Sequence, residues 1–149
     1  MNLPQFEQRA RRLIDSFWGA VLGAGVYGAW ATFANWDAGW QVALTVGLSH
    51  WLMSTFLTYT GTGVMRRCYR VGRGRLEGAL LALTGGLSFT YVLLIALHHA
   101  IGTPHLALTL AAGVIPNLLF CSSYSLLLSR TLPLARAEAV EDTAVSHGI

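Results

Sequence analysis

A single histidine lies deep inside a long apolar run, on a helix face that also carries hydroxyl groups. The run spans residues 41–65, and His50 comes nine residues after its first residue. At a rise of about 1.5 Å per residue, His50 lies roughly 13 Å inside the run, near the centre of a bilayer. Ser54 and Thr58 follow at four-residue steps on the same face. An ionisable group at that depth is a candidate site, and the alternative is a neutral histidine bonded to a nearby carbonyl.

A second polar stripe follows the last apolar run, residues 106–128. It includes Asn117 and Tyr124, and the neighbouring Pro116 removes one backbone hydrogen bond near the middle of the run. The second and fourth runs have the same direction, so His50 and Asn117 lie at similar depth and are expected to face a common interior. We interpret the two stripes as a path for a polar headgroup or a small solute; its expected residues are His50, Ser54, Thr58, Asn117 and Tyr124. The competing interpretation is that these side chains hold the helices together.

Three further histidines lie near the ends of the apolar runs. These ends are opposite to those that the arginines flank. His98, His99 and His105, together with Asp37, are residue types that bind zinc or copper. Adjacent residues on a helix point about 100° apart, however, and the spacing matches no compact metal motif. We therefore expect no metal site and no cofactor, with these histidines as weak candidates only, and a pH-sensitive rim is an equal alternative.

Arginines concentrate in the segment between the second and third runs, RRCYRVGRGR at residues 66–75. Such a segment attracts the phosphates of anionic lipids. The expected phosphate-binding residues are Arg66, Arg67, Arg70, Arg73 and Arg75. Because arginines fall only outside the apolar runs, they indicate membrane topology and not a nucleic-acid partner.

The elements that must position these residues follow from composition. The chain has 149 residues, of which 54% are hydrophobic and 11% charged, whereas soluble domains carry about a quarter charged residues. Four apolar runs, each near the ~20 residues that a bilayer requires, lie at 16–34, 41–65, 77–98 and 106–128. Lipid offers the backbone no hydrogen bonds, so each run is expected to be a helix. The sequence predicts an all-α, integral membrane four-helix bundle at 16–131, preceded by a basic segment at 1–15 and followed by a mobile tail at 132–149.

All ten basic residues are arginines, and their positions predict the orientation of the helices in the membrane. They precede the first run, join the second and third, and follow the fourth, so both termini are expected in the cytoplasm, at a bacterial inner membrane. Trp36, Trp40 and Tyr69 stand where interfacial aromatic residues are typical. Residues 42–47 and 106–111 are similar, which indicates either two tandem hairpins or a chance match between apolar helices.

Small residues recur at four-residue steps on the first and third runs, where they allow helix backbones to approach closely. The expected packing residues are Ala20, Ala24, Gly28, Gly78, Ala82 and Gly86. Four helices hardly enclose a solute, so we also expect a homo-oligomer or a partner membrane subunit.

No nucleophile with a base, paired carboxylates or phosphate-binding glycine loop occurs, so the sequence predicts no enzyme. The four-span layout resembles that of the small multidrug resistance transporters. Their membrane-embedded glutamate has no counterpart here, because the first run contains no acidic residue and Asp15 lies just before it. No family is therefore assigned. The expected function is a small transporter or flippase-like protein for a lipid or a lipid-linked or polar small molecule. The alternative is a non-catalytic accessory or assembly subunit of a larger membrane complex.

Overall fold

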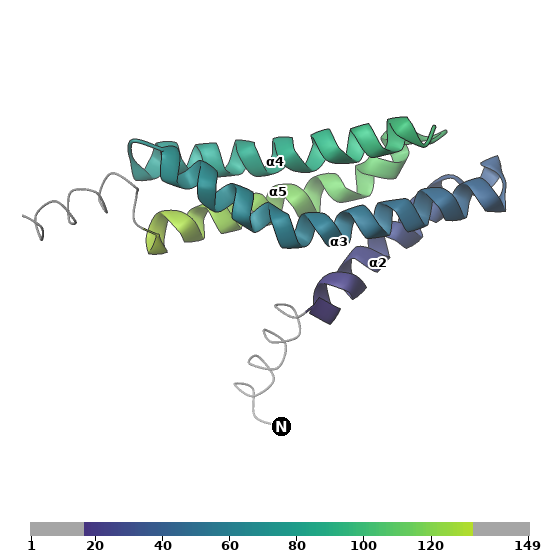
Figure 1. Cartoon of the computed structure of the whole chain (residues 1–149), viewed down its shortest axis with the longest axis horizontal. Helices are drawn as coiled ribbons and strands as arrows, with labels where there is room; N and C mark the ends of the chain where they lie inside the picture. Colours follow the sequence, from purple (N-terminus) through teal and green to yellow (C-terminus); the bar gives the residue numbers. More distant parts are fainter. Residues whose placement is uncertain (1–16, 133–149) are drawn as a thin grey trace, which may run out of the picture. The chain divides into compact units, whose positions relative to one another are not determined.

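The computed structural model describes residues 17–132, with side chains from residue 21 onward. This part of the chain contains four α-helices, one short 3-10 helix and no strand (Figure 1). The elements are α2 (Phe17–Ala34), η1 (Trp36–Ala38), α3 (Trp40–Val71), α4 (Arg75–Ala100) and α5 (Leu106–Thr131). The all-α prediction is therefore confirmed, whereas the segment 1–15 and nearly all of the tail 132–149 lie outside the described residues.

Two of the helices are long and apolar enough to cross a membrane. They are α4 and α5, and only 17% and 11% of their most apolar stretches are buried within the protein. A soluble protein buries its apolar core helices, because apolar surface left in water is costly. Large side chains such as Leu76, Val92 and Ile115 instead point outward, at 76%, 64% and 69% exposure. These two helices suggest that the protein associates with a membrane.

Helix α3 is longer than the sequence predicted. The apolar run ends at residue 65, but the helix continues to Val71, so Arg66, Arg67 and Arg70 lie on its last turns and not in a loop. Arginine is a good helix former, and the chain reverses only where two glycines interrupt it. A Cβ at Gly72 would stand 2.5 Å from the Cα of Gly78, so this tight turn requires glycine.

The chain divides into two compact units, each built from parts of several helices. Within the described residues, unit 1 comprises 17–59 and 93–113, and unit 2 comprises 60–92 and 114–132. Unit 1 therefore holds α2, η1, the first part of α3, the end of α4 and the start of α5. Unit 2 holds the remaining parts of α3, α4 and α5.

In unit 1, α2 and α3 meet backbone to backbone. A Cβ at Gly28 would lie 2.8 Å from the Cβ of Trp51 and 2.9 Å from the carbonyl oxygen of Gly47. The Trp51 indole N–H donates to the carbonyl of Val21 at 2.8 Å, which ties the same two helices together. The close approach thus depends on the absence of side chains at the crossing.

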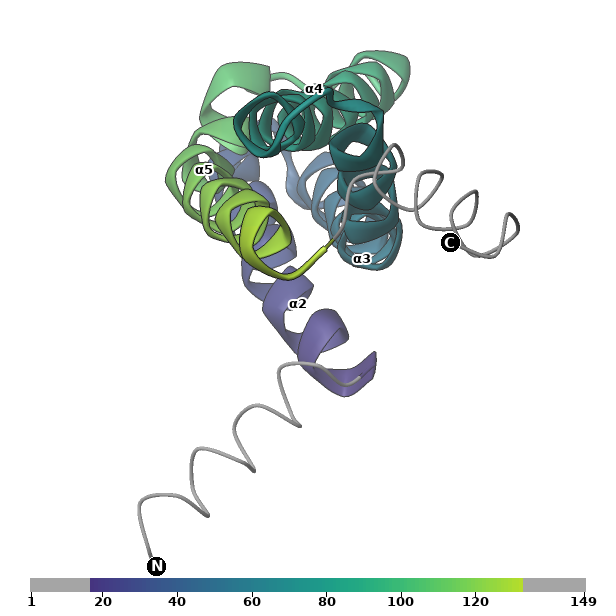
Figure 2. The same ribbon diagram turned by 90° about the vertical axis from the view of Figure 1, so that its left-hand side faces the viewer.

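Unit 2 has a small core formed by α3, α4 and α5. Viewed from the end where α3 and α4 are joined, the three helices stand at the corners of a triangle (Figure 2). The core residues are Met65, Tyr69, Ala82, Cys121 and Leu128. Tyr69, which the sequence suggested as an interfacial aromatic residue, is fully buried between the helices, because glycine at position 78 leaves room for its ring. Trp36 and Trp40, in contrast, are 60% and 62% exposed.

The small residues expected to pack between helices are buried inside these units. Ala24 and Gly28 are buried in unit 1, and Gly78, Ala82 and Gly86 in unit 2. A Cβ at Gly86 would stand 2.7 Å from the Cγ of Met65, so this residue lies directly against α3. The side chain of Ala20 is outside the described part.

Replacement of Gly28 tests the α2–α3 crossing. We expect Gly28→Val to lower the stability by about 1–3 kcal/mol, because the added side chain meets Trp51 and the backbone of Gly47. Gly23→Val is the matched control on the same helix, since nothing lies within 4 Å of a Cβ at that position. Thermal unfolding of both variants in one detergent measures the difference. Equal losses would contradict the crossing as described.

Candidate functional site

The deep histidine of α3 is paired with a histidine of α4. His50 Nδ1 and His98 Nε2 are 2.8 Å apart, and the two side chains are only 4% and 1% exposed. His98 Nδ1 makes a second hydrogen bond, 2.8 Å long, to Thr103 Oγ1 in the loop after α4. The backbone N–H of Thr103 also donates to the carbonyl of His98, so the loop folds back onto the end of the helix. All three residues belong to unit 1.

The sequence pointed to His50 but assigned His98 to a surface group. His98 is two residues from the end of α4, whereas His50 is ten residues inside α3. Contact between them therefore depends on the register of the two helices, which no spacing along the chain reveals.

The other two histidines near this end do not join the pair. His99 is exposed, and His105 Nε2 donates to Asp37 at 3.0 Å. Residues 17–132 contain no group of three or more His, Cys, Asp or Glu side chains that could hold a metal ion. The three histidines that the sequence offered as weak metal candidates thus have different surroundings.

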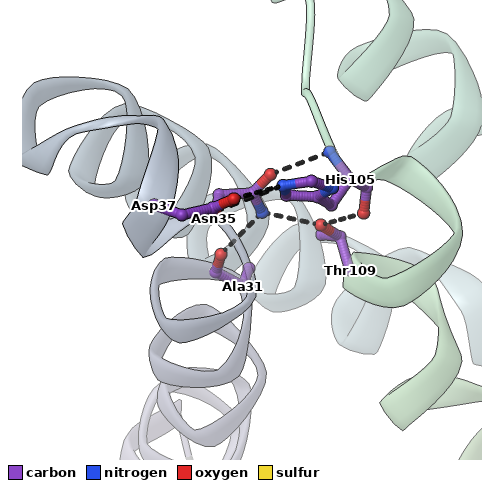
Figure 3. A network of polar contacts seen from close by, with 5 residues as sticks. All are labelled: Ala31, Asn35, Asp37, His105 and Thr109. Carbon is purple, nitrogen blue, oxygen red and sulfur yellow. Dashed lines mark hydrogen bonds and ion pairs between the residues drawn. The ribbon is translucent and has the colours of Figure 1, made fainter.

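A second polar network fixes the loop before α3 to the start of α5 (Figure 3). The side chain of Asn35 is fully buried at its centre. Its Nδ2 donates to the carbonyl of Ala31 at 2.9 Å and to Thr109 Oγ1 at 2.8 Å. Its Oδ1 accepts from the backbone N–H of His105 at 3.0 Å, just before α5 begins. Asn35 therefore joins α2 to α5. Its Oδ1 accepts from one of the backbone N–H groups that have no partner within the helix at its start.

The exposed edge of this network carries a hydrogen-bonded pair, the imidazole of His105 and the carboxylate of Asp37. The hydrogen bond from His105 lowers the pKa of Asp37 below its ordinary value, and desolvation offsets this effect only in part. The pair is open to solvent, with the two side chains 44% and 72% exposed. Water screens such a pair, so Asn35 and not Asp37 is the main connection.

The arginines lie at one end of unit 2. All five of the expected phosphate-binding residues, Arg66, Arg67, Arg70, Arg73 and Arg75, are exposed. Arg66 Nε donates to Tyr124 OH at 2.7 Å, which connects α3 to the polar stripe of α5. The ring of Tyr124 also stacks on Phe120, with an angle of 5° between the ring planes.

The remaining residues of the expected path have partners of different kinds. Asn117 Nδ2 lies 3.5 Å from Tyr91 OH, within unit 2. Thr58 is exposed, and its hydroxyl donates to the carbonyl of Ser54 on its own helix. Such back-bonding satisfies a hydroxyl inside an apolar segment without any ligand. His50 belongs to unit 1 and Asn117 to unit 2, and a common interior for both stays a prediction.

Comparisons of the chain with protein-family models, with curated proteins and with solved structures found no match. Function must therefore be argued from the site.

Replacement of Asn35 tests the network of Figure 3. We expect Asn35→Ala to cost about 1–3 kcal/mol of stability, because the backbone N–H of His105 loses its acceptor and the Thr109 hydroxyl keeps only its bond to the carbonyl of His105. Asp37→Asn, which changes only the exposed pair, is expected to leave the melting temperature nearly unchanged. Thermal unfolding of both variants at one pH decides between them. A larger loss of stability in Asp37→Asn would show that the pair of Asp37 and His105 is the main connection between the loop before α3 and the start of α5.

Proposed function

We propose that this protein spans the bacterial inner membrane four times, with both termini in the cytoplasm, and binds and moves anionic lipid or lipid-linked headgroups. The apolar exposed faces of α4 and α5 support a membrane location. The uneven charge supports the orientation. In the described part, unit 2 carries six arginines, Arg66, Arg67, Arg70, Arg73, Arg75 and Arg130, while unit 1 carries none. The positive-inside rule puts the arginine-bearing end in the cytoplasm.

The hydrogen bond between Arg66 and Tyr124 is the observation that carries the proposal. It connects the cluster of exposed arginines to α5, on which Asn117 lies two turns from Tyr124, toward the N-terminus of the helix. A headgroup phosphate bound by the arginines would find hydroxyl and amide groups on the adjacent apolar helix. Guanidinium groups suit phosphate oxygens because they offer several donors in a fixed geometry. Ser54, Thr58 and His50 are proposed to add polar groups in unit 1.

The orientation is tested by fusing a reporter to the C-terminus. A green fluorescent protein folds in the cytoplasm, and alkaline phosphatase is active only on the other side. We expect the fluorescent fusion to be bright and the phosphatase fusion to be inactive, because the arginines retain their end of the helices in the cytoplasm. An active phosphatase fusion would overturn the proposed orientation.

Lipid movement is tested in vesicles that contain the purified full chain and a fluorescent phosphatidylglycerol. A membrane-impermeant reductant bleaches only the outer leaflet, so movement across the bilayer appears as additional bleaching. We expect Arg66→Gln to slow this process about fivefold, because the arginine bonded to Tyr124 is proposed to hold the headgroup phosphate and one such contact contributes about 1 kcal/mol. Tyr124→Phe is expected to slow it as well, because Arg66 loses its tether.

Two controls accompany this measurement. Arg130→Gln removes another exposed arginine of unit 2 that lies outside the 66–75 segment, and it is expected to leave the rate close to that of the unmodified protein. Fluorescent phosphatidylcholine should move more slowly than phosphatidylglycerol. Vesicles that bleach no further than protein-free ones would contradict the proposal. Purification together with a larger foreign complex would then favour an accessory subunit.

A further inference from the structure

An unbroken hydrogen-bond chain runs from the loop after α4 into the interior of unit 1. Thr103 Oγ1 contacts His98 Nδ1, and His98 Nε2 contacts His50 Nδ1, each at 2.8 Å. Thr103 is half-buried, whereas the two imidazoles are nearly inaccessible. Both ring nitrogens of His98 thus have a partner within the protein. The chain joins a group near solvent to one enclosed by helices.

The geometry limits how many protons the two imidazoles can hold. A neutral imidazole has one N–H donor and one acceptor nitrogen, so one ring of the pair must donate to the other. If both rings were protonated, two N–H groups of like charge would face each other at 2.8 Å with no acceptor between them. Such a state is strongly disfavoured. One added proton, in contrast, leaves an N–H⁺ of one ring donating to the free nitrogen of the other.

Thr103 provides a route by which the proton reaches the pair. Its hydroxyl both donates and accepts, so it bonds to His98 Nδ1 in either protonation state of that nitrogen. Its backbone N–H, bonded to the carbonyl of His98 at 2.9 Å, keeps the hydroxyl in place. Donor and acceptor can therefore exchange roles in each hydrogen bond from Thr103 to His50 without movement of the helices.

Few other titratable side chains in the described part of unit 1 could take up the proton in place of the histidine pair. In the described part of unit 1, α2 contributes only the tyrosine Tyr27, whose ring centroid lies 6.5 Å from that of His50. Leu106–Gly113 of α5 contains no titratable residue. The other titratable residues of this part are Tyr59 on α3, exposed His99 on α4, and Asp37 and His105, which pair with each other. The hydrogen bonds described for the pair involve only its own rings and Thr103.

We propose that His50, His98 and Thr103 form a binding site for a single proton, shared between the two imidazoles and exchanged through Thr103. The proposal does not depend on lipid binding. On acidification the proposed site takes up one proton, whereas a purely structural pair would take up none and two separate histidines would take up two.

The test is nuclear magnetic resonance of the full chain in lipid, with ¹⁵N-labelled histidine. The chain has five histidines, so the signals can be assigned by single substitutions. We expect a coupling between the ¹⁵N nuclei of His50 Nδ1 and His98 Nε2 across the hydrogen bond. As the pH falls, the summed signals of the two rings should report one added proton, half the uptake of two independent histidines.

Substitutions separate the roles. His99→Gln, the matched control next to the pair, should leave the coupling and the single-proton uptake intact. His98→Gln should abolish the coupling and leave His50 to titrate alone, and Thr103→Val should keep the coupling but slow proton exchange severalfold. Absence of the coupling, no proton uptake by the pair, or uptake of a full proton by each ring would overturn the proposal. Both of these measurements use the unmodified protein, so they decide the question even if His98→Gln fails to fold.

Discussion

The close approach of helices through small residues is the constraint on which the rest of the structure depends. Ala31, Ala43 and Ala82 are completely buried, while many leucines, valines and phenylalanines point outward. A water-soluble bundle has the opposite arrangement, because water drives large apolar side chains inward. Helices surrounded by lipid gain little from burying leucine, and they associate instead by close backbone contact. The glycines at 28, 47, 78 and 86 make that contact possible.

Close backbone contact also explains why the buried polar side chains have partners on other helices. With α2 held near α5, the amide of Asn35 reaches both Thr109 and the backbone N–H of His105, just before α5 begins. With the end of α4 near the middle of the first part of α3, two imidazoles come within hydrogen-bond distance. An unpartnered polar group in such surroundings would cost several kcal/mol. Within the described residues, only Tyr69 OH and Ser125 Oγ are buried without a partner.

The two units carry different kinds of charged and titratable side chains. The described part of unit 2 carries arginines and one glutamate, Glu77, whose carboxylate accepts from the backbone N–H of Arg73 before α4. Unit 1 carries histidines and Asp37 in that part. Arginine stays charged at all relevant pH values and suits phosphate, whereas histidine changes its charge near neutrality and suits a proton. The arginines proposed to bind phosphate and the histidines proposed to bind a proton thus belong to different units.

The sequence alone determined the helical class and the approximate positions of all four helices. The apolar composition of α4 and α5 suggests association with a membrane, and turn residues such as Gly39 and Gly102, both with positive φ, mark the places where the chain reverses. It also identified His50 as an unusual residue, because an ionisable group inside an apolar run is rare whatever the fold. Only the tertiary structure decided that His98 is its partner, that Arg66 contacts Tyr124 and that Tyr69 is buried. These facts depend on the register and rotation of one helix against another. Contacts across helices fix both, whereas the period of a single helix fixes only which residues share a face.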